Sequence, residues 1–286
     1  MMGVLFRIQS QRRRGIMAGN PRKQGAEQYY TVKNVAKHFT EVVIERFGNN
    51  RTYLEPSAGG GAFVDSLKEC GVSDILSYDI EPRHSDVVEA DFLNLDLNKS
   101  GLIAIGNPPF GRACALATKM FNKCAESCDI IAFIIPPSFR KPSIEDKLHP
   151  EFFRTYTEKC PDVSFETPNG TVYEMGRLRT EFQIWERKKG QTRPKRQSYR
   201  SDKFQFVKKH ENPDLAFRTH GDGAGRILQG LDYNPRTTAF IKLIDPKAKE
   251  ALQKADYSYW MEATSHIPCI APAEISLSVD EWYQQN

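Results

Sequence analysis

Apolar runs of strand length alternate with segments of helical periodicity over residues 26–188. The run at 129–135 is almost continuously apolar, as expected of a strand buried on both faces of a parallel sheet. Strands that alternate with helices predict an α/β fold built on a Rossmann-like, mostly parallel sheet. The predicted strands are 53–55, 75–80, 87–89, 102–105 and 129–135, and the predicted helices are 32–47, with Thr31 as N-cap, 63–70 and 113–127.

The later elements are shorter, and they suggest a second, smaller unit after residue 204. This part of the chain is interpreted as a small α+β domain, with a purely structural cap as the alternative. The expected elements up to residue 188 are a helix at 152–156, edge strands at 164–166 and 171–173, and a strand at 180–186 that closes the sheet. The expected elements after residue 204 are strands at 204–207, 239–243 and 275–279, a helix at 245–255 with Pro246 at its first position, and a flexible loop at 221–226.

The composition is that of a globular protein without a membrane span. The chain has 286 residues, 40% of them hydrophobic, which is enough for one full α/β domain and a smaller one. No apolar run reaches the ~18 residues that a membrane span requires. Six cysteines lack paired metal-ligand spacing, so we expect reduced thiols in an intracellular protein and no metal site.

The basic residues are unevenly distributed. A net charge of +4 favours a nucleic-acid partner only weakly. Residues 188–209, however, contain nine Lys or Arg against a single acid, Asp202. This run is either a solvated linker or a strap that follows nucleic-acid phosphates, with Lys195 and Arg196 as candidate contacts.

These observations divide the chain into four parts. Residues 1–25 are basic and lack a signal-peptide core, so we expect a disordered tail or a start at Met17, with a transit peptide as the alternative. An α/β domain (26–188), a basic linker (189–203) and a small domain (204–286) follow.

The loop Asn107-Pro108-Pro109-Phe110 carries the most specific chemistry. Proline fixes φ and restrains the residue before it, so Asn107 is held on a stiff loop at the carboxyl end of a strand. Ligands bind at that position in open α/β sheets. The Asn107 side-chain carbonyl and the Pro108 backbone carbonyl can accept hydrogen bonds from one amino group, and Phe110 offers a face for a planar base. The loop therefore suits amine alkylation; a Pro-rich turn that caps a core strand is the alternative.

Acids close the three strands that precede this loop. Glu55 begins a glycine-rich turn, Glu55-Pro56-Ser57-Ala58-Gly59-Gly60-Gly61, whose backbone can approach a ligand closely. Because an acid beside the turn would repel a pyrophosphate, the turn suits a cationic, phosphate-free cofactor such as S-adenosylmethionine. Asp79, or alternatively Glu81, can accept from ribose hydroxyls, and Asp91 can accept from an adenine amine while Phe92 packs on its ring. Each acid alone would be read as a solvated turn residue.

Taken in order, the glycine turn, Asp79, Ala90-Asp91-Phe92-Leu93 and Asn107-Pro108-Pro109-Phe110 resemble the N6-adenine DNA methyltransferases that carry the cofactor region first and target recognition last. The resemblance spans roughly residues 28–188. It implies a class I methyltransferase fold, S-adenosylmethionine as cofactor, no metal, and a C-terminal domain for target recognition. The short spacing from Asp79 to Asp91 departs from the family, because it leaves little room for the usual helix.

The resemblance also implies roles for single residues. Thr31 would lie in the cofactor segment before the fold, and the base would be flipped out of a duplex toward the site. The implied catalytic residues are Asn107, Pro108, Pro109 and Phe110; the cofactor would contact Thr31, Glu55, Pro56, Ser57, Ala58, Gly59, Gly61, Asp79, Asp91, Phe92 and Asn107; and the substrate would contact Phe110, Phe139, Arg140, Tyr173, Lys195 and Arg196. Phe165 and Tyr156 compete with Tyr173, and loop packing is the alternative role of Phe139.

Rival functions stay open at this point. RNA methyltransferases acting on adenine N6 or guanine N2 carry the same loop, and enzymes that methylate a protein glutamine carry a relative with Tyr. An inert nucleic-acid-binding subunit is a further alternative, against which the intact tetrad argues. The basic run and the trailing domain favour nucleic acid, with DNA ahead of RNA by resemblance. We expect a monomer or homodimer in the cytoplasm of a bacterial or virus-infected cell, or in the nucleus of a eukaryote.

Overall fold

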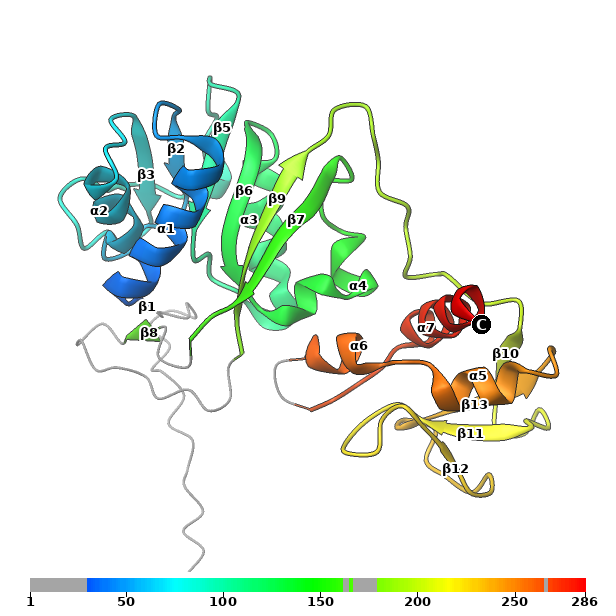
Figure 1. Ribbon diagram of the computed structural model, residues 1–286. Helices are drawn as coiled ribbons and strands as arrows, with labels where there is room; N and C mark the ends of the chain where they lie inside the picture. Colours follow the sequence, from blue (N-terminus) through cyan, green and yellow to red (C-terminus); the bar gives the residue numbers. More distant parts are fainter. Residues whose placement is uncertain (1–29, 162–164, 167–178, 265–266) are drawn as a thin grey trace, which may run out of the picture.

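The computed structural model describes residues 30–161, 165–166, 179–264 and 267–286. Its larger sheet has seven strands in the order β4-β3-β2-β5-β6-β9-β7 (Figure 1). The strands β4 to β6 are parallel, and β9 runs antiparallel to both of its neighbours. This topology confirms the predicted Rossmann-like α/β fold. The bounds are β2 Tyr53–Glu55, β3 Ile75–Asp79, β4 Val88–Glu89, β5 Leu102–Gly106, β6 Cys128–Ile135, β7 Phe152–Lys159 and β9 Glu181–Arg187.

The strand order reverses between β2 and β5. From β2 the chain adds β3 and β4 on one side, and it then returns to add β5 and β6 on the other. The carboxyl ends of β2 and β5 therefore flank a topological switch point, where open α/β sheets bind their ligands.

Helices cover both faces of this sheet, because the central strands are apolar on both sides. In β5, Ile103 and Ile105 pack with α1 (Lys33–Phe47) and α2 (Ala62–Glu69), while Leu102 and Ala104 pack with α3 (Ala115–Cys124). Such burial on both faces is typical of parallel strands. Short helical turns complete the layer: η1 Phe92–Asn94, η2 Arg112–Cys114, η3 Pro137–Arg140 and α4 Pro142–Glu145.

Two expectations for this sheet were wrong. The segment 152–156, predicted as a helix, lies in β7, whose exposure alternates as in a strand with one face in solvent. Phe152, Phe153 and Tyr156 fit a helical spacing, but the edge of β9 offers pairing partners to seven residues of β7, with one register shift between Arg154 and Tyr156, and this pairing decides the outcome. The predicted strand at 180–186 is confirmed as β9, yet it does not close the sheet, because β7 pairs outside it.

A second sheet, of two strands, lies at the start of α1. Tyr30 and Thr31 form β1 (Tyr30–Thr31), which pairs antiparallel with β8 (Phe165–Glu166). This confirms part of the predicted strand at 164–166, while the predicted strand at 171–173 lies outside the described residues. Thr31 is not the N-cap of α1; that position belongs to Val32, without a side-chain cap.

The C-terminal unit has its own antiparallel sheet, in the order β10-β13-β11-β12. Three helices pack against it around a core that includes Phe217, Trp260 and Ile275. This agrees with the predicted small α+β unit. The strands are β10 Phe204–Val207, β11 Leu215–Arg218, β12 Arg226–Leu228 and β13 Thr238–Leu243, and the helices are α5 Ala248–Lys254, α6 Ser258–Glu262 and α7 Pro272–Gln285.

Two expectations in this unit need correction. Residues 275–279, predicted as a strand, lie within α7. Ile275 and Val279 are four residues apart, so both reach the core from one face of a helix that starts with Pro272. The helix predicted at 245–255 begins only at Ala248, after a turn that contains Pro246.

No helix among the described residues is long and apolar enough to cross a bilayer. All six cysteines are free thiols, as expected.

Candidate active site

A buried carboxylate lies at the switch point of the sheet. Glu55, the last residue of β2, is 1% exposed, and its Oε1 has no hydrogen-bond partner among the described residues. A Cβ atom placed on Gly106, the last residue of β5, would lie 2.0 Å from that oxygen. Only glycine fits this position, and its absence of a side chain brings the carboxylate next to the Asn107 loop.

The electrostatics of Glu55 follow from this burial. Desolvation raises its pKa well above the usual value, and the nearby Asp79 charge raises it further, while the Ser57 backbone N–H lowers it. A buried acceptor without a donor costs free energy. A cationic donor group brought to Glu55 would remove that cost, so this position at the switch point suits an ammonium-bearing ligand.

The glycine turn is held to β3 by backbone and side-chain hydrogen bonds. Gly59 donates its N–H to Asp79 Oδ2 at 2.8 Å, and Ala58 donates to the Tyr78 carbonyl at 2.9 Å. The φ of Gly59 is +47°, a left-handed conformation that favours glycine. Asp79 Oδ1 also accepts from the Glu81 N–H, so this carboxylate organises the turn; its predicted contact with the ribose stays a prediction.

Tyr30 is a residue of this site that the sequence reasoning did not assign. A Cβ on Gly59 would lie 2.6 Å from Tyr30 Cε1, which shows that the ring rests directly on the turn. Arg83 stacks over the ring at 5.5 Å. Beside it, Thr31 is buried, and its Oγ1 lacks a partner within the described residues. The segment before α1 thus covers the glycine turn, and the pair of tyrosines before Thr31 was the available signal.

Asp91, the third of the predicted acids, hydrogen-bonds to residues next to it in the chain. Asp91 is exposed and accepts from the Leu93 N–H and the Asn94 side chain, so it caps the short helix η1. Phe92 is buried in the core, 6.3 Å from the Tyr78 ring. Their predicted contacts with adenine remain predictions.

The loop after β5 is tightly folded. The Ser57 hydroxyl donates to the backbone carbonyl of Asn107 at 3.5 Å, and this hydrogen bond joins the loop to the glycine turn. Phe110 is 8% exposed and packs in the core, while its carbonyl accepts from the Leu116 and Ala117 N–H groups. Ala113 and Cys114, which follow in the chain, both have φ above +50°. Non-glycine residues rarely adopt this conformation, and strain of this kind gathers at functional loops.

The structure does not bring all predicted substrate residues to this loop. Phe139 is fully buried in the core, in agreement with the packing alternative. Arg140 is buried, with its guanidinium 3.2 Å from Glu181 and stacked 4.7 Å over the Tyr259 ring. Tyr173 lies outside the described residues, and Lys195 is exposed.

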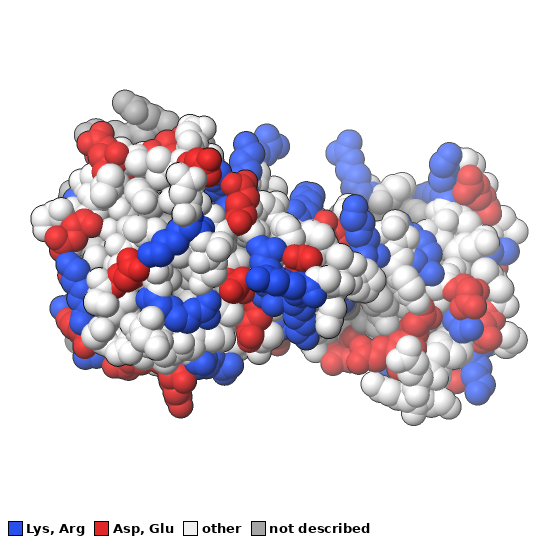
Figure 2. Space-filling model, turned by 90° about the horizontal axis from the view of Figure 1, so that it is seen from above, with Lys and Arg blue, Asp and Glu red and all other residues white. Residues whose placement is uncertain are grey.

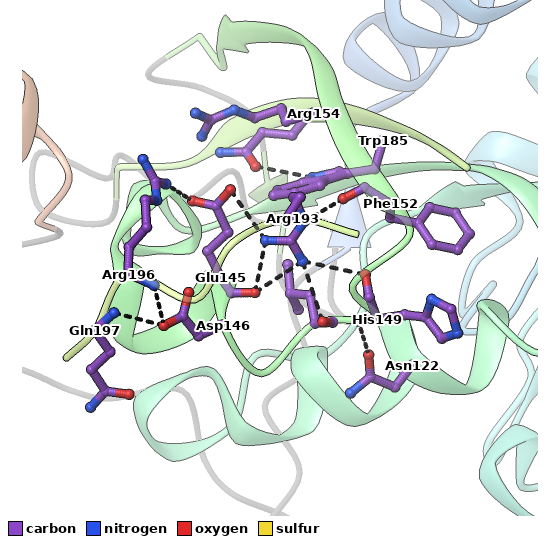
Figure 3. A network of polar contacts seen from close by, with 12 residues as sticks. Asn122, Glu145, Asp146, His149, Phe152, Arg154, Trp185, Arg193, Arg196 and Gln197 are labelled. Atoms are coloured by element: carbon purple, nitrogen blue, oxygen red, sulfur yellow. Dashed lines mark hydrogen bonds and ion pairs between the residues drawn. The ribbon is translucent and has the colours of Figure 1, made fainter. Parts of the chain in front are cut away.

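The basic linker starts on the opposite edge of the sheet from Asn107. Ile135, at the carboxyl end of β6, pairs with Glu181, the first residue of β9. Because β9 runs antiparallel to β6, its last residue, Arg187, lies at the amino edge of the sheet. The linker is then fastened by Arg193 and Arg196, which both pair with Glu145 (Figure 3). Arg196, predicted as a substrate contact, has its guanidinium paired with the Glu145 carboxylate, and its contact with a substrate stays a prediction.

No family model matches the chain. The chain is similar to the type II methyltransferases M.HincII and M.HindII of Haemophilus influenzae. Each is 27% identical over 157 residues, which covers 50% of this chain and 29% or 28% of the relative, so the chain spans less than a third of their length. Among solved structures, the 23S rRNA methyltransferase ErmE matches with a TM-score of 0.42 and 15% identity over 57% of this chain and 70% of that one.

The seven-stranded sheet has the class I methyltransferase fold, with its reversal of strand order between β2 and β5. Within that class of fold, the chain is distantly related to the type II methyltransferases.

Proposed function

We propose that this protein transfers a methyl group from S-adenosylmethionine to the exocyclic N6 amine of adenine in DNA. The observation that carries the proposal is the place of Asn107-Pro108-Pro109-Phe110: it follows β5 at the switch point, beside the buried carboxylate of Glu55. The distant similarity to type II DNA methyltransferases supports DNA as the substrate.

The residues at the switch point suit S-adenosylmethionine. Glu55, whose Oε1 has no partner in the described part of the chain, would receive the ammonium of the methionine moiety, and the backbone of the Pro56–Gly61 turn would enclose it. Thr31 would contact the same moiety, Asp79 the ribose hydroxyls, and Asp91 with Phe92 the adenine ring. When bound, this cofactor supplies an electrophilic methyl group on a sulfonium.

The residues of the loop act on the target amine. The Asn107 side-chain carbonyl and the Pro108 backbone carbonyl accept hydrogen bonds from its two N–H groups, which draws the nitrogen lone pair out of conjugation and aims it at the electrophile. The stiffness that Pro108 and Pro109 give the loop keeps both acceptors in place. Holding reacting groups in such near-attack geometry can lower a barrier by several kcal/mol.

Phe110 would stack on the extrahelical base, which offsets part of the few kcal/mol that flipping a base costs. Because the ring packs in the core here, stacking requires the loop at 107–114 to rearrange. The left-handed conformations of Ala113 and Cys114 store strain that such a rearrangement would release. The second stacking residue is proposed to be Tyr173.

We further propose the division into a methyltransferase domain (26–188), a linker (189–203) and a target-recognition domain (204–286). The two separate sheets support this division.

The test is Asn107→Ala, with the exposed Asn98→Ala as matched control. Loss of one hydrogen-bond acceptor to the reacting group should lower kcat by about 10²-fold or more, by analogy with other preorganised groups. The Kd of S-adenosylmethionine, measured by calorimetry, should stay near the wild-type value. Transfer of labelled methyl into DNA and RNA pools gives the rate and the substrate together. Wild-type turnover by Asn107→Ala would refute the assigned role, and labelling of RNA alone would refute DNA as substrate.

A further inference from the structure

The C-terminal unit contains a cleft of 750 Å³ that no part of the proposed methyl transfer uses. It lies between β10, β13 and the segment at 269–274, and it reaches Lys141 of the sheet unit. This volume lies within the range found for pockets that bind small-molecule ligands.

The charge of this cleft is positive. Among its described lining residues the carboxylate of Glu274 is the one acid, and it is 1% exposed and bonded to Lys141 Nζ at 3.0 Å. Lys208 and Arg236 line the rim and are exposed. In the described part of the chain no carboxylate lies within ion-pair distance of either side chain, so both charges remain available to an anion.

The wall of the cleft is apolar. Val207 and Phe240 stand directly opposite each other on the paired strands β10 and β13, and Ile270 also lines the cleft. Thr238, two residues before Phe240, is buried, and its Oγ1 has no hydrogen-bond partner within the described ranges. The cleft thus combines cations at its rim, an apolar wall, and one polar atom without a partner.

The cleft lies on the side of the molecule that carries the Asn107 loop. Lys141 follows β6, the strand next to β5, at the carboxyl edge of the sheet. At the same edge, Lys159 of β7 pairs with Glu262 of α6 at 3.4 Å. Figure 1 shows α6 below α4, on the side of the C-terminal unit that faces the sheet. Figure 2 looks down on the opposite, upper edge, where the linker leaves β9, and shows Lys and Arg side chains gathered there between the two units.

We infer that this cleft binds a strand of the nucleic-acid substrate, with phosphates on Lys208 and Arg236 and a sugar against Val207 and Phe240. A polyanion with apolar sugar faces matches both the rim and the wall. The basic linker is a poorer candidate, because Arg193 and Arg196 are committed to Glu145. The inference rests on the proposed function for the identity of the substrate, and it assigns a binding surface to residues that the methyl-transfer site does not include.

The experiment measures binding without turnover. Fluorescence anisotropy of a labelled DNA duplex, and of a labelled RNA hairpin as the second arm, is recorded over a series of salt concentrations. Lys208→Ala/Arg236→Ala should weaken binding about tenfold or more and reduce the slope of log K against log[salt] by about one per lost phosphate contact. The control is Lys247→Ala/Lys249→Ala, which removes two exposed lysines beside and in α5, away from the cleft, and should change both quantities less.

The outcomes separate the two proposals. If the cleft variant loses affinity for the duplex or the hairpin while wild-type protein methylates neither, the cleft assignment stands and the proposed function fails. If wild-type protein methylates DNA but the cleft variant binds and methylates it with wild-type affinity and salt slope, the cleft assignment is overturned and the function stands. Equal losses in the cleft variant and the control would also overturn it, since they would show only an effect of net charge.

Discussion

At the scale of single residues, Glu55 and Gly106 define the site. Their contact requires a glycine at the end of β5 and places a carboxylate where burial disfavours its charge. The same burial would favour a bound cation, because the desolvation penalty falls when a charged donor pairs with the carboxylate. Stability and binding therefore compete at this position.

Glu55→Gln tests this competition. The folded-state pKa of Glu55 is raised above the ordinary 4.5, so the native protein holds this proton more tightly than the unfolded chain. The stability that the protonated form contributes is complete below that ordinary value and is lost as the pH rises toward the folded pKa. The variant has no charge to bury, so its Tm should match wild type in acid and exceed it at neutral pH.

The measurement is Tm against pH between about pH 4 and pH 8, without cofactor, with the exposed Glu89→Gln as control. The Kd of S-adenosylmethionine for Glu55→Gln should rise roughly 30-fold, since a charge-assisted hydrogen bond contributes about 2 kcal/mol. If Glu55→Gln were no more stable than wild type at neutral pH and bound the cofactor with the wild-type Kd, the buried carboxylate would neither destabilise the fold nor bind the cofactor.

Much of this site could be predicted at the residue scale. The strand ends that carry Glu55, Asp79 and Asn107 follow from apolar runs that stop at an acid or a proline, and these signals are local. The core position of Phe110 and the packing of Tyr30 on Gly59 could not be predicted, because each depends on a neighbour distant in sequence.

At the scale of elements, the linker shows how a charge run can be structural. Arg193 donates to the Phe152, Glu145, Leu148 and His149 carbonyls and pairs with Glu145 Oε1 at 3.3 Å. Its guanidinium also lies 5.4 Å from the centre of the Trp185 ring (Figure 3). These contacts fasten the linker to the loop between α4 and β7. Composition alone could not distinguish this arginine from its solvated neighbours.

Arg193→Ala should therefore destabilise the sheet unit by about 3 kcal/mol, because several carbonyls lose their donor and the buried Glu145 carboxylate loses one of its two cationic partners. Arg193→Lys should recover only part of this, since an ammonium cannot reproduce the planar fork of the guanidinium. Urea unfolding gives the free energies. The matched control, Lys189→Ala at an exposed linker position, should change stability by less than about 0.5 kcal/mol. Equal midpoints for Arg193→Ala and Lys189→Ala would show that the linker is merely solvated.

The two misassigned elements, β7 and α7, failed for a related reason. Short apolar patterns such as Phe152-Phe153 or Ile275…Val279 fit either period, and the surroundings decide. The open edge of β9 makes the first a strand, and a core reached from one side makes the second a helix. The central strands were predictable because their apolar runs are long and bounded by clear breaks.

At the scale of the whole molecule, one buried ion pair joins the two units. Lys141 Nζ, just after η3, contacts both carboxylate oxygens of Glu274 in α7 and donates to the Cys269 carbonyl at 2.9 Å. Both side chains are at least nine-tenths buried. Because Lys141 follows the strand next to β5, this contact fixes the C-terminal cleft relative to the Asn107 loop.

Lys141→Met should destabilise the protein by about 3 kcal/mol, since it leaves the Glu274 charge buried and unpaired. Adding Glu274→Met should restore much of that loss, as an apolar pair of similar volume often replaces a buried ion pair. A double-mutant cycle on urea unfolding gives the coupling energy. The exposed pair Lys159–Glu262, which spans the same two units, is the matched control and should couple by less than about 1 kcal/mol. If the two cycles gave the same small coupling, the buried pair would not be what holds the units in register, and the orientation of the cleft toward the Asn107 loop would have to come from the contacts of Arg140 and Arg154 with Tyr259 instead.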